Sequence, residues 1–287
     1  MVAQPVLIAS IGANRTAHTR PANVLTKEVF MTATTLRWVV AAITAFVVGT
    51  AGSARADTVL LAFQDTTPRE DLYIHAYSGT FATMPTGAMQ FNVTGGTATG
   101  FGSTLTSFCT QIFTNVYPDP TVSVPYNVVP LTGLADVQQQ PRGNGVNTPA
   151  QQTAIANYLT ELWGRYDQFT NTAVGAAAFQ LDVWKILYDP VGSTDLTTGN
   201  LNVFGASLTD PAVALATQWL STLTGDTTQF TNNPLYAGQE LVGLASAGYQ
   251  EQITIRDIPG VPAPAGLILG LLGVCTLAAR VRVIRSA

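Results

Sequence analysis

Residues 148–166 read TPAQQTAIANYLTELWGRY and contain the clearest helix-start signal in the chain. Thr148 offers an N-cap hydroxyl, Pro149 stands at the first helical position and Gln151 stands at N3. Together these residues form a capping box, in which the cap side chain and the N3 side chain satisfy each other's backbone N–H groups. We therefore expect a helix over residues 149–166.

Two more helices are expected on the C-terminal side of this one. The first covers about residues 172–188 and ends before Pro190, because the residue preceding a proline disfavours helical geometry. The second begins at Asp210-Pro211 and stops near Gly225. The sequence thus predicts a helical region of about three helices between residues 148 and 225.

On both sides of the helical region, β-branched and aromatic residues alternate between turn residues. The expected antiparallel strands cover residues 58–63, 72–79, 88–95 and 121–129, with a return to strand character over residues 240–258. Strands, a helical insert and a closing strand indicate an α+β fold. We expect an antiparallel β-rich domain, barrel-like or sandwich-like, that carries the helices as an insert.

The N-terminal part of the chain has the pattern of an export signal. Residues 31–56 contain a positive charge at Arg37, then an apolar stretch, then small residues that lead to an A-x-A pattern around Arg55, which predicts cleavage between Ala56 and Asp57. A signal peptide belongs at the true N-terminus, so residues 1–30 are interpreted as a non-native or disordered leader. Met1 and Met31 both stay open as the start.

The C-terminal part, residues 261–287, combines an uncharged apolar run with a basic end. Residues 265–279 carry no charge and are followed by Arg280, Arg282 and Arg285. With the preceding residues the run reaches the roughly 17–20 residues that a spanning helix needs. Positive charge beside a span marks the cytoplasmic side, which places residues 57–260 outside the inner membrane. The alternative is a core helix that ends the domain.

This tail resembles the PEP-CTERM sorting signal of Gram-negative bacteria, which the membrane enzyme exosortase reads. The matching residues are Val261, Pro262, Ala263 and Pro264, the apolar run and the three arginines. Ala263 stands where the family usually has glutamate. The resemblance implies transit through the inner membrane, processing near the proline motif, and delivery to the cell surface or the exopolysaccharide matrix.

The composition of residues 57–260 argues against several classes of function. This segment has sixteen acidic and five basic residues, a net charge of about −11, which argues against nucleic acid as a partner. Its one histidine, His75, cannot supply a histidine metal cluster or catalytic triad. Carboxylates such as Glu70 and Asp71 are interpreted as solvated surface groups. We expect no cofactor, no metal and no enzymatic activity.

Two residues stand out chemically. Cys109 is the only cysteine of residues 57–260, because Cys275 lies in the tail. A lone cysteine in an oxidising compartment has three common explanations. It forms a disulfide with another molecule, its thiol takes part in a specific reaction, or it is a buried free cysteine that packs as a small hydrophobic residue. Gln180 falls on the inner face of the expected second helix, whereas Asp182 and Lys185 are expected to face away from the core as an i,i+3 pair.

These residues resemble the reactive pair of bacterial surface thioester domains. Phe108-Cys109 matches the aromatic-cysteine element, and the run from Phe179 through Gln180 to Trp184 matches the Gln-x-x-apolar-Trp helix. Asp182 stands where the family usually has alanine. The resemblance implies a Cys109–Gln180 thioester, which amines or hydroxyls on a neighbouring surface could attack.

Two functional interpretations follow. The first is a non-enzymatic surface or matrix protein, sorted by its tail and held by non-covalent contacts, with exosortase and exopolysaccharide as expected partners. The second is an adhesin that becomes linked covalently through Cys109 and Gln180.

Overall fold

The computed structural model describes residues 57–77, 79–140 and 145–258. All of them belong to the compact unit Arg55–Ala287, as distinct from the unit Met1–Ala54. The predicted leader, signal peptide and sorting signal therefore lie outside the described residues, apart from Asp57. Within the described part of the chain, no helix combines the length and apolar character needed to cross a membrane.

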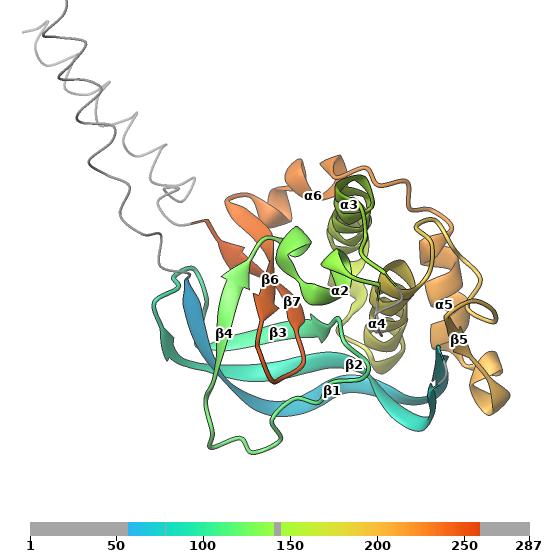
Figure 1. The fold of residues 1–287 in the computed structure, drawn as a ribbon, viewed down its shortest axis with the longest axis horizontal. Coiled ribbons are helices and arrows are strands. Elements are labelled where there is room, and N and C mark those ends of the chain that lie inside the picture. Colours follow the sequence, from blue (N-terminus) through green and yellow to red (C-terminus); the bar gives the residue numbers. More distant parts are fainter. Residues whose placement is uncertain (1–56, 78, 141–144, 259–287) are drawn as a thin grey trace, which may run out of the picture. The chain divides into compact units, whose positions relative to one another are not determined.

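A closed antiparallel sheet forms the base of the fold (Figure 1). Its strands are β1 (Thr58–Ala76), β2 (Gly79–Gly96), β3 (Thr104–Cys109), β4 (Val124–Val129), β5 (Leu201–Val203), β6 (Gln239–Ala245) and β7 (Gln252–Asp257). The strand order is β2-β3-β7-β6-β4-β1-β5, and β2 also pairs with β1. This additional pairing closes six of the strands into a barrel and leaves β5 beside the far end of β1.

The long β1–β2 hairpin extends beyond the barrel. The first residues of β1 pair with β4, its last three residues pair with β5, and β2 accompanies it throughout. Four register shifts interrupt the β1–β2 pairing. Because each such irregularity bends and twists a strand, one strand can serve both the barrel and the ribbon that underlies the helices.

The helices come mostly from the chain between β4 and β6. They are α2 (Ala135–Gln138), α3 (Pro149–Tyr166), α4 (Ala173–Tyr188), α5 (Pro211–Leu220) and α6 (Thr228–Thr231), with short 3₁₀ helices at Leu131–Gly133, Asp167–Phe169, Gly205–Thr209 and Pro234–Tyr236. Figure 1 shows them gathered on one side of the sheet, above the long hairpin. The central helix α4 contacts β1, β2, α3 and α5, and every residue from Gly175 to Tyr188 is buried.

The helix predictions are confirmed at most of their ends. Thr148 and Gln151 form the predicted capping box at α3, and the Thr172 hydroxyl caps α4 by accepting from the Gly175 N–H. The prediction for the third helix was wrong at its C-terminus, because α5 ends at Leu220 and not near Gly225.

A buried carboxylate explains why the chain leaves helical geometry after α5. Glu161 of α3 is fully buried, and its Oε2 accepts from the N–H groups of Thr224, Gly225 and Asp226 at 2.7, 2.6 and 3.0 Å. Arg165 Nη2 lies 2.7 Å from Glu161 Oε1. These N–H groups are committed to a side chain and cannot extend α5.

The strand predictions were correct in type but not in extent. Residues 58–63 and 72–79 were expected as two strands, yet one strand, β1, runs through the polar residues between them because β2 supplies backbone partners. The short strands β3 and β5 were not predicted. The expected closing strand is a hairpin, β6 and β7, which completes the barrel by pairing with β4 and β3.

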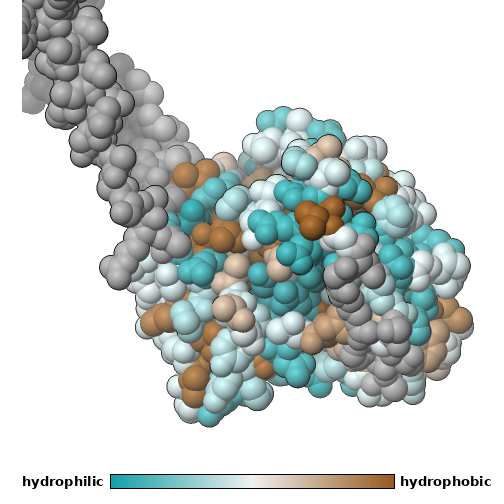
Figure 2. Space-filling model, in the orientation of Figure 1, coloured by the Kyte–Doolittle hydropathy of each residue, from teal (hydrophilic) through white to brown (hydrophobic). Residues whose placement is uncertain are grey.

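The described surface is predominantly polar. In the face shown in Figure 2, hydrophobic residues are scattered among hydrophilic ones. The exposed large hydrophobic residues of the described ranges are Val122, Val146, Phe169, Leu208, Leu235 and Ile258. Isolated apolar residues of this kind are ordinary on folded domains and do not by themselves mark a binding surface.

Candidate functional site: a buried cysteine and glutamine

Cys109 is the last residue of β3 and lies in the core beneath α4. Its side chain is 2% exposed, and it is a free thiol. β3 pairs with β7 at this point, where Cys109 lies opposite Gln252. The barrel therefore holds the cysteine backbone rigidly on the strand side of the helix interface.

Gln180 of α4 meets Cys109 across this interface, 71 residues later in the chain. The Cys109 N–H donates to Gln180 Oε1 at 2.9 Å, and Gln180 Nε2 donates to the Cys109 carbonyl oxygen at 2.8 Å. Gln180 is 1% exposed. The two hydrogen bonds hold the carboxamide flat against the cysteine backbone, so the structure brings together the two residues that the sequence singled out.

An aromatic cluster includes the residues that precede Cys109 and Gln180 in the chain. Phe108, Trp163 and Phe179 form a cluster with ring centroids 4.4–5.9 Å apart, which joins β3, α3 and α4. All three are at most 2% exposed. Aromatic packing of this kind excludes water from the pair and fixes the spacing between strand and helix.

Trp184 lies one helical turn after Gln180 and touches the thiol. Its indole N–H interacts with the Cys109 side chain and lowers the pKa of the thiol. The same Nε1 atom is buried and makes no hydrogen bond of ordinary geometry within the described residues. The indole N–H is thus a donor available to a group that carries more negative charge than a neutral thiol.

Burial dominates the electrostatics of Cys109. Loss of hydration raises the pKa of the thiol far above its ordinary value, the Trp184 contact opposes this, and the Asp136 charge raises the pKa further. The thiol is therefore neutral at pH 7 and a poor nucleophile toward added reagents. Chemistry at Cys109 has to come from a partner that the fold holds beside it.

A pair of carboxyl groups lies close to Cys109 and was missed in the sequence analysis. Burial and the neighbouring Glu251 charge raise the pKa of Asp136 to about 7, although a hydrogen bond from Tyr188 lowers it. The Tyr188 hydroxyl donates to Asp136 Oδ2 at 3.3 Å and accepts from the Ile112 N–H at 2.9 Å. Asp136 can therefore exchange a proton near neutral pH. No local pattern marks Asp136 or Glu251, which are 115 residues apart in the sequence.

The structure corrects the prediction for Asp182 and Lys185. Both were expected to face away from the core, but they are 0% and 1% exposed because α4 is enclosed on all sides. Lys185 pairs with Asp189 and not with Asp182. Neither carboxylate oxygen of Asp182 has a hydrogen-bond partner in the described residues, and burial raises its pKa well above the usual range.

The surface interpretation of the carboxylates was likewise wrong for several groups. Asp71 is exposed and Glu70 partly so, as expected. The buried acidic residues are Glu161, Asp182, Asp189 and Glu251. In the sequence each of them looks like an ordinary surface residue. Only the packing of distant segments shows that it is buried.

These buried acids predict a stability that falls as the pH rises. The pKa values of Asp136 and Asp167 are raised to about 7 and about 6, chiefly by burial, and those of Glu251 and Asp182 are raised as well. The folded state therefore holds protons that the unfolded chain releases above about pH 4. The free energy of unfolding is highest below that pH and falls as the pH rises from about 4 to about 7.

We expect the free energy of unfolding to be roughly 2 kcal/mol lower at pH 8 than at pH 5 from Asp136 alone. Urea unfolding at both pH values measures the total difference from all the buried acids. Asp136→Asn should remove the share of that difference that Asp136 contributes. Glu251, Tyr188 and Cys109 face Asp136 and contribute to its titration. Equal stability at the two pH values would contradict the raised pKa values.

Of the remaining predicted site residues, only Asp57 falls within the described ranges. Its side chain contacts Arg256 at 3.3 Å, and its carbonyl accepts from the Val128 N–H at 2.8 Å. Ala56, the proline motif at 261–264 and the arginines at 280, 282 and 285 lie outside the described residues. The predicted cleavage and sorting positions stay predictions.

Comparison with known proteins found similar folds among solved structures. The chain is similar to the N-terminal thioester domain of the fibronectin-binding protein SfbI from Streptococcus pyogenes, with 16% identity over 69% of this chain and 98% of that one, at a TM-score of 0.40. It is also similar to the N-terminal domain of the Streptococcus pyogenes pilus tip adhesin Cpa, with 15% identity, 68% and 98% coverage and a TM-score of 0.36. No protein-family model and no curated protein matches the chain. Similarity at this level does not carry residue roles across, so the candidate site rests on the contacts described above.

Proposed function

We propose that this protein is an exported surface protein in which Cys109 and Gln180 condense into an internal thioester. The observation that carries the proposal is the reciprocal pair of hydrogen bonds that holds the Gln180 carboxamide against the Cys109 backbone in a dry, aromatic site. Any buried glutamine needs hydrogen-bond partners, and many backbone groups could supply them. Here both partners belong to Cys109, the only free cysteine of the described residues, and this coincidence supports a chemical role for the pair.

The condensation is a balanced acyl transfer. Cys109 Sγ bonds to Gln180 Cδ, the Cδ–Nε2 bond breaks, and the thiol proton leaves with the ammonia. During the step negative charge develops on Gln180 Oε1, which already accepts from the Cys109 N–H at 2.9 Å. That N–H is positioned as an oxyanion donor, and the Trp184 indole N–H can stabilise charge on sulfur. No oxidant, metal or cofactor takes part.

The product is an electrophile for covalent attachment. An amine or hydroxyl of a second molecule attacks Gln180 Cδ, the Cδ–S bond breaks, and the thiol of Cys109 is regenerated with the proton that the nucleophile gives up. The Asp136 charge influences the pKa of the Cys109 thiol, and the pKa of about 7 of Asp136 suits proton exchange during this step. The outcome is a permanent amide or ester bond to a surface partner.

The location proposed for this chemistry is the cell surface or the exopolysaccharide matrix. The apolar and basic pattern of residues 261–287 supports export followed by handling by an exosortase-type enzyme, and the acidic, lysine-poor composition suits an extracytoplasmic environment.

A second candidate function is a non-covalent matrix protein whose Cys109 is inert. The raised pKa of the thiol and the satisfied hydrogen bonds of the carboxamide favour it, because both are typical of unreactive residues in a protein core.

Intact mass of the purified chain separates the two candidates. In a Cys275→Ala background, Cys109 is the only thiol. A thioester lowers the mass by about 17 Da, the mass of ammonia, and methylamine then adds to the protein and frees one thiol for alkylation in denaturant. An unmodified mass, no methylamine adduct and one alkylatable thiol in denaturant would exclude the thioester. Alkylation has to follow denaturation, because the folded site shields the thiol.

A further inference from the structure

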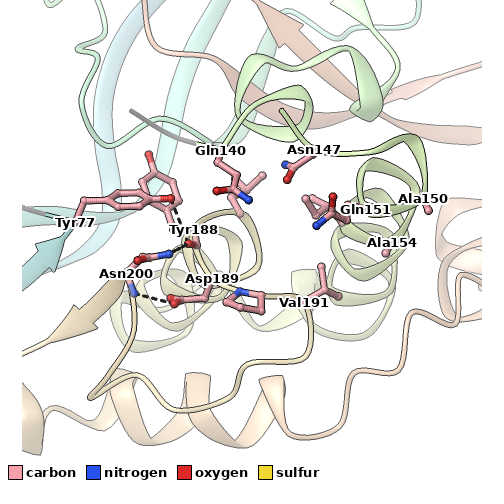
Figure 3. Close-up of a pocket in the computed structure, with 13 residues that line it drawn as sticks. Tyr77, Gln140, Asn147, Ala150, Gln151, Ala154, Tyr188, Asp189, Val191 and Asn200 are labelled. Atoms are coloured by element: carbon pink, nitrogen blue, oxygen red, sulfur yellow. Dashed lines mark hydrogen bonds between the residues drawn. The ribbon is translucent and has the colours of Figure 1, made fainter. Parts of the chain in front are cut away.

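A cavity of about 500 Å³ is lined in part by Tyr188, which also belongs to the surroundings of the candidate site. Its walls come from the first turns of α3, the end of α4, the loop that follows α4, and Tyr77 just after β1 (Figure 3). The volume lies within the range of roughly 300–1,000 Å³ that is typical of small-molecule pockets. We call it the Tyr77–Tyr188 pocket after its two aromatic residues.

The described residues that line the Tyr77–Tyr188 pocket offer no free charge. Asp189 is its only acidic lining residue, and Lys185 Nζ lies 2.9 Å from Asp189 Oδ2. The Asp189 oxygens also accept from the N–H groups of Asn200 and Leu201 at 2.8 and 3.1 Å. Because these contacts satisfy the carboxylate, a phosphate, carboxylate or ammonium ligand would lose its hydration without gaining a counter-charge.

Carboxamide groups line the pocket, and several of their atoms are unused. Gln151 Oε1 accepts from Thr148 in the α3 cap, which leaves Nε2 without a partner in the described residues. Asn147 Nδ2 donates to the Val137 carbonyl oxygen and Asn200 Nδ2 donates to the Tyr188 carbonyl oxygen, which leaves both Oδ1 atoms available. Asn147 is only 6% exposed. One donor and two acceptors therefore belong to residues that line one cavity, of which Gln151 and Asn200 are exposed.

The aromatic wall is held in an unfavourable backbone geometry. Tyr77 has φ 51°, in the left-handed region that a bulky residue rarely adopts, and its N–H donates to the Asn200 carbonyl oxygen at 2.6 Å. Its ring lies 5.8 Å from the Tyr188 ring at 45°. Strain of this kind is kept where the surrounding structure requires one side-chain position, and it is concentrated at binding sites.

We propose that the Tyr77–Tyr188 pocket binds a neutral saccharide unit. A sugar ring presents C–H faces that pack on tyrosine and aliphatic walls, and hydroxyls that both donate and accept. The unused carboxamide atoms meet the second requirement, and the described lining residues offer no counter-charge to an acidic or a basic sugar. The proposal stands apart from the thioester, although the pocket and the surroundings of Cys109 have Tyr188 in common.

Binding of neutral oligosaccharides to the full chain tests the proposal. Cellohexaose, maltohexaose and mannohexaose are the probes, with an oligogalacturonate and an uncharged Gly-Ser peptide as comparisons. We expect saturable binding, measured by calorimetry, of at least one neutral hexasaccharide. Failure of all three to bind would overturn the proposal, and so would equal binding of the oligogalacturonate or binding of the peptide alone.

Two variants locate the binding. Gln151→Glu keeps an acceptor for the α3 cap but replaces the free Nε2 donor with a carboxylate oxygen, so affinity should fall at least about tenfold. Ala154→Phe fills the cavity from α3 and should abolish binding. Gln218→Glu, the same change at an exposed position of α5, is the matched control and should bind as the unaltered chain does. Unchanged binding in both pocket variants would overturn the proposal. Cys109→Ala should keep full affinity, which separates this test from that of the thioester.

Discussion

The Gln180→Glu chain is expected to fold and to take up no methylamine, a loss of at least ~100-fold in adduct yield. The amide of Gln180 can expel ammonia when the Cys109 sulfur attacks its carbonyl carbon. A carboxyl group at the same place would have to expel water or hydroxide, and its ionised form repels a sulfur nucleophile. The change therefore removes the electrophile while keeping the shape of the side chain.

Fold retention decides how this result is interpreted. The carbonyl oxygen that accepts from the Cys109 N–H survives the change, and a protonated carboxyl can still donate to the Cys109 carbonyl oxygen. If the variant nevertheless unfolds, Cys109→Ala gives the same information, because both hydrogen bonds to Gln180 come from the backbone of residue 109. Methylamine uptake at the unaltered level in either variant would rule out the Cys109–Gln180 thioester.

Lys185→Met is expected to lower the free energy of unfolding by about 3–5 kcal/mol. Lys185 is 1% exposed, and its Nζ lies 2.9 Å from Asp189 Oδ2. It also donates to the carbonyl oxygens of Thr198 and Leu201 at 2.7 and 3.0 Å. Removing the ammonium leaves a buried carboxylate without a counter-charge and two carbonyl groups without this donor.

A double-mutant cycle with Asp189→Asn separates the ion pair from the two carbonyl contacts. The double variant should be more stable than Lys185→Met alone, because the unpaired buried charge is then removed. Urea unfolding midpoints measure all four chains. A loss below about 1 kcal/mol for Lys185→Met would mean that the pair is solvated as surface pairs are, contrary to its burial.

Local signals account for the parts of the fold that were predicted well. The Thr148 capping box and the proline after Asp189 act within a few residues, so the ends of α3 and α4 could be predicted from the sequence. β3 and β5 carry no comparable signal. They are short, and they form because distant strands offer them backbone partners.

The residues of the candidate site likewise fall into those that local sequence motifs predicted and those that they did not. Cys109 and Gln180 were predicted because each belongs to a short motif with its own chemistry. Asp136, Glu251 and Tyr188 were not, because the significance of each depends on neighbours that lie far away in the chain. The orientation of Asp182 was predicted wrongly for a related reason, since helical spacing shows which residues share a face but not how many faces are covered.

The sequence by itself determined the ends of α3 and α4, the α+β class and the acidic charge, and it singled out a lone cysteine and a glutamine motif. These depend on residue types, on their spacing, or on contacts within one helical turn. The tertiary structure alone decided the closure of the barrel, the burial of Asp182 and Lys185, the raised pKa of Asp136 and the Tyr77–Tyr188 pocket. Each of these depends on which surfaces lose water when distant segments meet, and desolvation is a property of the packed chain and not of any short stretch.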